Sequence, residues 1–147
     1  WNYNMLYYRQ GLGFGDAVTR IKDAARIVKQ HDTSHPVATV YGELPSDHVL
    51  HSLPEIDIWG MNVYNELSLG SIFDEWKRRS KLPMFLGEYG ADAYDARTHS
   101  ENEGAQAQAT TVLTNDIVSH SSVLNPDNVC TGGFIFEFAD EWWKDPR

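Results

Sequence analysis

Hydrophobic positions along the chain follow two alternating patterns, one typical of helices and one typical of buried strands. Residues 16–31 carry alanine, valine and isoleucine on one stripe at the helical period, and residues 36–43 then form a short β-rich run. The same alternation of patterns recurs as far as residue 143. We therefore expect a chain built from repeated strand and helix units around a parallel sheet.

The boundaries of these units follow from the same patterns. The predicted strands cover residues 36–43, 56–64, 82–90 and 132–143, and the predicted helices cover residues 16–31, 71–80 and about 103–120, with a brief helix after Ser46 and a long loop from Ala91. The strands are nearly continuous apolar runs, as expected when both faces of a parallel sheet are covered. Four such units fit either half of a (β/α)8 barrel or a small doubly wound sheet. The chain contains no glycine-rich phosphate loop, which weakens the nucleotide-binding form of the second alternative.

Composition narrows the classes of partner. A length of 147 residues with 41% hydrophobic positions suffices for one globular core, so we expect a single domain over residues 1–147. The net charge of −9 opposes binding to nucleic acid and to anionic membranes. No apolar run approaches the roughly 20 residues of a membrane-spanning helix. The single cysteine, Cys130, supports neither a disulfide framework nor a cysteine metal cluster.

Polar and aromatic side chains gather where the predicted strands end. Asn62 and Tyr64 end the second strand, and Glu88 ends the third, where it stands in the sequence LGEYGAD between Gly87 and Gly90. The fourth strand ends in Asp140, Glu141, Trp142 and Trp143. The carboxyl ends of parallel strands meet on one rim, and carboxylates, amides and aromatic rings together are typical of a carbohydrate site.

Each of these residues also has a structural interpretation. Glu88 could be a salt-bridged residue, the tryptophans could be packing, and Asn62 and Tyr64 could satisfy loop backbone groups. His48 and His51 lie three apart on the short helix without a third ligand of matching spacing, so we expect a solvated face rather than a metal site. Asp92 and Asp95 alone are too few ligands for calcium. We therefore expect no metal.

The motifs, taken in order, resemble a known family. LPMFLGEYGAD resembles the nucleophile strand, the seventh, of retaining glycoside hydrolases built on the (β/α)8 barrel, DIWGMNVYNELSLG looks like the sixth strand, and GGFIFEFADEWWK is similar to the eighth. The nearest types are the β-glucuronidase and β-galactosidase type (family 2) and the β-1,3-glucanosyltransferase type. The resemblance implies an α/β fold that is the C-terminal half of a TIM barrel.

The resemblance also implies roles for individual residues. Glu88 would be the catalytic nucleophile, Tyr64 would hydrogen-bond to it or to the sugar, and Trp142 would stack on the sugar. Weaker candidates for contacts with the carbohydrate substrate are Asn62, Asp140, Glu141, Tyr3 and Asn4. No cofactor is required by this mechanism.

One departure concerns the second carboxyl group. In these families the acid/base glutamate ends the fourth strand and can be followed by Trp-Asn-Tyr, and this chain starts with WNYN. The acid/base would therefore immediately precede Trp1. Glu43, one strand later, is interpreted as a substrate contact or a structural residue.

The length also agrees with half of a barrel of about 250 residues. A half-barrel exposes sheet edges, so the chain is expected either to form a homodimer through these edges or to aggregate. Two alternative hypotheses remain: a non-catalytic carbohydrate-binding relative, and a small α/β domain of unrelated function.

Overall fold

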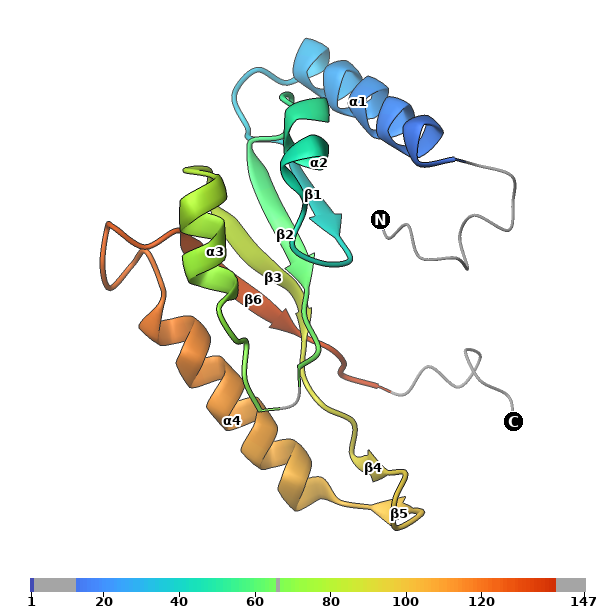
Figure 1. Ribbon diagram of the computed structural model, residues 1–147, viewed down its shortest axis with the longest axis vertical. Coiled ribbons are helices and arrows are strands. Elements are labelled where there is room, and N and C mark those ends of the chain that lie inside the picture. The colour runs from blue at the N-terminus through green and yellow to red at the C-terminus, as the bar shows by residue number, and fades with distance from the viewer. Residues whose placement is uncertain (2–12, 66, 140–147) are drawn as a thin grey trace.

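The computed structural model describes residue 1, residues 13–65 and residues 67–139. Strands and helices alternate along most of this part of the chain (Figure 1). The elements are α1 (Phe14–His31), β1 (Ala38–Tyr41), α2 (Asp47–Ser52), β2 (Ile58–Asn62), α3 (Ile72–Arg79), β3 (Met84–Tyr89), β4 (Tyr94–Asp95), β5 (Ser100–Glu101), α4 (Glu103–Ser119) and β6 (Cys130–Ile135).

Four of the strands form one parallel sheet in the order β1-β2-β3-β6. Each strand is joined to its neighbour in the sheet through a helix, and spatial order follows chain order. This is the expected α/β fold, with four parallel strands and helices as in part of a (β/α)8 barrel. The small hairpin β4–β5 stands apart as an antiparallel pair between β3 and α4.

The sequence predicted the order of the main elements correctly but not all of their limits. The fourth strand was predicted over residues 132–143, whereas β6 starts at Cys130 and ends at Ile135. Residues 136–139 lie beyond this strand, and residues 140–143 lie outside the described residues. The predicted loop from Ala91 contains the two short strands of the hairpin. The other strands are three or four residues shorter than expected because the predicted ranges include residues on either side of the hydrogen-bonded ladder.

All four helices contribute to one hydrophobic core against the sheet. Ala25 of α1, Val49 of α2, Trp76 of α3 and Leu113 of α4 are buried together with residues of the strands. The indole Nε1 of Trp76 donates to the carbonyl of Leu82 at 2.7 Å, so this buried polar group is satisfied. Ser46 caps α2 as predicted, because its hydroxyl accepts from the amide of Val49.

The other side of the sheet is open. Phe134 of β6 is 66% exposed, and its ring lies edge-on to that of Phe85 with 5.9 Å between centroids. A cavity of about 460 Å³ is lined there by Ala38, Ile58, Phe85, Thr131, Gly132, Gly133 and Phe134. The described residues therefore leave an apolar sheet face in contact with solvent.

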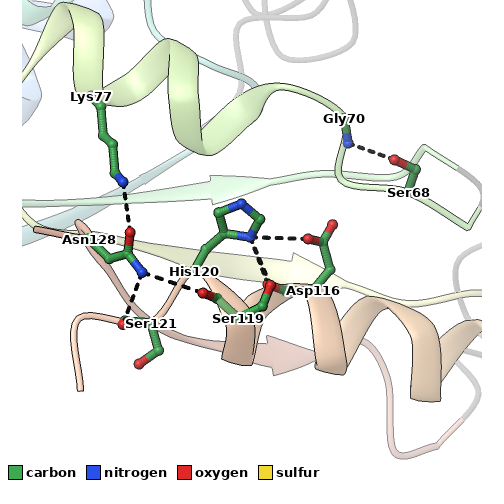
Figure 2. Close-up of polar contacts among 8 residues, drawn as sticks. All are labelled: Ser68, Gly70, Lys77, Asp116, Ser119, His120, Ser121 and Asn128. Atoms are coloured by element: carbon green, nitrogen blue, oxygen red, sulfur yellow. Dashed lines mark hydrogen bonds and ion pairs between the residues drawn. The ribbon is translucent and has the colours of Figure 1, made fainter. Parts of the chain in front are cut away.

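The amino end of β6 is fixed by polar contacts with α3 and α4, shown in Figure 2. Lys77 donates to the side-chain oxygen of Asn128 at 2.7 Å, and the Asn128 amide donates to the carbonyls of Ser119 and Ser121. His120 lies 3.1 Å from the carboxylate of Asp116 and stacks on Phe73. These contacts lie at the end of the sheet opposite to the predicted site.

Helix α1 is held to the sheet by two ion pairs. Lys29 lies 2.7 Å from Asp57, and Arg26 lies 2.9 Å from Glu55. The Asp57 carboxylate also accepts from the backbone amide of Val37 at 2.8 Å. Asp57 therefore links α1 to the segments that lead into β1 and β2.

Candidate active site

Glu88 and Tyr64 meet at the carboxyl end of the sheet. The Tyr64 hydroxyl donates to Oε2 of Glu88 at 2.7 Å. Backbone bonds fix this part of β3 on both sides, because the amide of Val63 donates to the carbonyl of Glu88 and the amide of Phe136 donates to the carbonyl of Tyr89. A carboxylate near the end of β3 is thus held by a side chain that lies two residues beyond the end of β2.

The electrostatic surroundings keep Tyr64 in its neutral, donating form. Partial burial of the hydroxyl raises the pKa of Tyr64 above its usual value, and the hydrogen bond to Glu88 and the charges of Glu88, Asp92 and Glu137 raise it further. The Tyr64 ring also lies edge-on to Phe136, with 6.5 Å between centroids. Tyr64 therefore stays protonated at neutral pH and donates a hydrogen bond to the carboxylate.

An irregularity in the sheet places Asn62 beside Glu88. Met61 pairs with Leu86 and Asn62 pairs with Glu88, so β3 has one residue more than β2 across this step. The additional residue is Gly87, where a Cβ atom would lie 2.6 Å from Val40 and 2.8 Å from Oδ1 of Asn62. Only glycine therefore allows this close approach. Oδ1 of Asn62 is buried and has no hydrogen-bond partner among the described residues.

Gly90 is required for a different reason. Its φ of +153° is rare for other residues, and a Cβ atom there would lie 2.5 Å from the carbonyl oxygen of Phe136. The two glycines around Glu88 thus allow β2, β3 and the segment after β6 to approach one another closely.

Trp1 lies against the free edge of β1. Its amino group donates to the carbonyl of Val40, and the amide of Gly42 donates to the carbonyl of Trp1 at 3.1 Å. These two bonds flank Tyr41 in the pattern of a parallel strand pair. Burial lowers the pKa of the Trp1 amino group, and the charge of Glu88 acts in the opposite direction.

The structure brings together three of the predicted site residues, namely Glu88, Tyr64 and Asn62. The predicted contacts Trp142, Asp140, Glu141, Tyr3 and Asn4 lie outside the described residues. Glu43 is exposed beyond the end of β1. Glu137, which alternates with Phe136 and Phe138 in the sequence, acts electrostatically on Tyr64 and was not among the predicted site residues.

Among the described residues, no group of three or more histidine, cysteine, aspartate or glutamate side chains is placed to hold a metal ion. No described helix is both long enough and apolar enough to cross a membrane.

Comparison with known proteins identifies a solved structure with a similar fold. No protein-family model matches the sequence, and no curated protein is significantly similar to it. Among solved structures, the chain is similar to a GH2 β-galacturonidase from Eisenbergiella tayi, solved with galacturonate bound, with a TM-score of 0.63 and 18% identity. The match covers 86% of this chain but spans only 25% of the galacturonidase. This similarity shows that the chain shares its α/β fold with part of a glycosidase.

Proposed function

We propose that the chain is the nucleophile-bearing half of a retaining glycoside hydrolase domain, with Glu88 as the nucleophile. The observation that carries this proposal is the 2.7 Å hydrogen bond from Tyr64 to Glu88 at the carboxyl end of a parallel sheet. The likeness in fold to a GH2 enzyme supports the same chemistry.

The proposed reaction has two displacement steps. A carboxylate oxygen of Glu88 attacks the anomeric carbon of the sugar, the bond to the leaving oxygen breaks, and an acid gives that oxygen a proton. The same acid, now a base, takes a proton from water or from an acceptor hydroxyl, which attacks the glycosyl-enzyme and releases Glu88. Tyr64 positions Glu88 for the first attack, since a charge-assisted hydrogen bond fixes the direction of the carboxylate.

The acid/base is proposed to lie on a strand that pairs with the free edge of β1. Such an acid must stand about 5–5.5 Å from the nucleophile. The parallel bonds of Trp1 around Tyr41 favour the position immediately before Trp1 in the intact protein. The same strand and its neighbours would cover the open face around Phe134. In the predicted homodimer, a second copy of the chain would pair with the exposed edges of the sheet in place of that strand.

The experiment combines product stereochemistry with a variant of the intact protein. Aryl β-glycosides are hydrolysed and the first-formed sugar is examined by proton NMR, where we expect the β-anomer. Glu88→Gln should abolish turnover and leave binding of the product sugar measurable by calorimetry. Glu103→Gln, an exposed carboxylate in the first turn of α4, is the matched control and should keep full activity.

Two results would contradict the proposal. An α-anomer as the first product would exclude retention. A wild-type protein that binds glycans but does not turn them over would instead favour the non-catalytic carbohydrate-binding hypothesis.

A further inference from the structure

A second cavity lies beside the Glu88–Tyr64 pair. It has a volume of about 320 Å³, at the lower end of the range of small-molecule pockets, and is lined by Ala91, Asp92, Ala93, Tyr94, Glu101, Gln106, Phe136 and Glu137. Phe136 joins the two sites, because it lines this cavity and its ring also packs against Tyr64. The cavity therefore adjoins the Glu88–Tyr64 pair through Phe136.

The walls of the cavity are held by α4 and the hairpin. Gln106 of α4 donates to the carbonyl of Ala91 at 3.2 Å, and the amide of Asn102 donates to the carbonyl of Ala93 at 2.6 Å. The pairing of Tyr94 with Glu101 closes the hairpin. The cavity is thus formed by the fold itself, with Tyr94, 56% exposed, as an aromatic surface at its edge.

The charges of the lining are of one sign. Asp92, Glu101 and Glu137 are acidic, and the lining residues include no lysine, arginine or histidine. In the hairpin, Arg97 is engaged by Asp95 through two bonds of 3.2 and 3.1 Å. Glu88 adds a further carboxylate on the Tyr64 side, and both Asp92 and Glu137 act electrostatically on Tyr64.

We propose that this cavity makes the site selective for uncharged glycosides and excludes sugars that carry a carboxylate. This inference rests on the proposed function. The carboxylates of the lining accept hydrogen bonds from sugar hydroxyls, and the rings of Tyr94 and Phe136 offer apolar surfaces to sugar C–H groups. A uronic acid would bring a further negative charge among these groups, and juxtaposed like charges are strongly unfavourable in a partly enclosed site. The selectivity would be opposite to that of the galacturonidase of similar fold, whose structure contains galacturonate.

The test compares matched substrates on the intact protein. Nitrophenyl β-galactoside and β-galacturonide, and the corresponding glucoside and glucuronide, differ in the oxidation of a single carbon and share their leaving group. We expect kcat/KM to be at least about 10-fold higher for the uncharged member of the preferred pair. This ratio should fall as salt is raised, because salt screens the repulsion.

Two variants examine the source of the selectivity. Asp92→Asn and Glu137→Gln should each raise kcat/KM for the uronide relative to the uncharged substrate by several-fold. Asp127→Asn, an exposed residue in the connection from α4 to β6, should leave the ratio unchanged. A uronide that is turned over as well as its uncharged partner would overturn the inference while the proposed function stands. A protein that hydrolyses neither class would contradict the proposed function and this inference with it.

Discussion

Met84 and Leu86 of β3 are completely buried against the helices, whereas the neighbouring side chain Phe85 lies with the 66% exposed Phe134 on the other side of the sheet. Both faces of the strands are apolar, so the sequence pattern is almost the same for the two. The difference is in what covers them: α1 to α4 contribute to the core on one face, whereas on the other face Phe134 stays 66% exposed beside an open cavity. The covered face supplies stability, and the open face carries the glutamate at its carboxyl end.

The largest difference should appear when one apolar side chain is removed from each face. Leu86→Ala should lower the free energy of unfolding by about 2–5 kcal/mol, because it leaves a cavity in a packed core. Phe134→Ala should cost less than about 1 kcal/mol, because most of its ring is in contact with solvent. Denaturant unfolding of the chain measures both. Equal losses would mean that the two faces are equally packed.

A second contrast concerns two glycines with similar backbone angles. Gly90 (φ +153°) faces the carbonyl oxygen of Phe136, whereas nothing lies within 4 Å of a Cβ atom at Gly132 (φ +140°). Gly132→Ala should cost about 1–2 kcal/mol from backbone strain alone, and Gly90→Ala should cost at least about 2 kcal/mol because of the additional contact. Thermal unfolding of the two variants gives the difference. If Gly132→Ala is the more harmful change, the close approach at Gly90 is not present in solution.

A change at the Glu88–Tyr64 pair should lower the rate of the proposed reaction rather than the stability of the chain. Tyr64→Phe removes the hydrogen bond to Glu88, so kcat/KM of the intact protein should fall by about 10- to 100-fold, in line with about 1.5–3 kcal/mol for a hydrogen bond to a charged group. Its unfolding free energy should change little, because Tyr64 is 55% exposed. An unchanged rate with lowered stability would make Tyr64 a packing residue.

The smallest effect is a pH dependence on the covered face. The Lys29 ammonium and the Val37 amide hold the pKa of Asp57 below its usual value. The unfolded chain therefore binds a proton at a higher pH than the folded chain, and stability is lost as the pH falls below about 4. Between pH 5 and pH 2, the unfolding free energy of Asp57→Asn should decrease less than that of the wild-type chain. The difference between the two decreases should be under about 1 kcal/mol. Chemical unfolding at several pH values measures this, and identical acid profiles would exclude the contribution.

The alternation of elements could be predicted because it depends on local patterns. In α3, Ile72, Phe73 and Trp76 have helical spacing and are buried as expected. The position of Glu88 at a strand end was also predictable, since an apolar run stops there between two glycines. Its hydrogen bond with Tyr64 is present in the structure, and the catalytic role that the family resemblance implied for Glu88 stays a prediction.

Other features depend on pairing across the sheet, which a linear pattern does not contain. The additional residue Gly87 brings Asn62 opposite Glu88, and strict alternation would have placed them out of register. The hairpin β4–β5 has two residues in each strand, too few for any periodicity. The pairing of Trp1 with the edge of β1 joins residues 39 positions apart. The early end of β6 could not be predicted because Phe136, Glu137 and Phe138 continue the strand-like alternation of apolar and polar residues beyond Ile135.

The most direct test of the central claim is to trap the covalent intermediate on the intact protein. A 2-deoxy-2-fluoro aryl glycoside with a good leaving group slows release of the glycosyl-enzyme, and peptide mass spectrometry then locates the bound sugar. The account predicts one sugar per protein, attached to the peptide that contains Glu88 and absent in Glu88→Gln. A sugar attached to another residue, or continued rapid turnover without labelling, would contradict the assignment of Glu88 as the nucleophile.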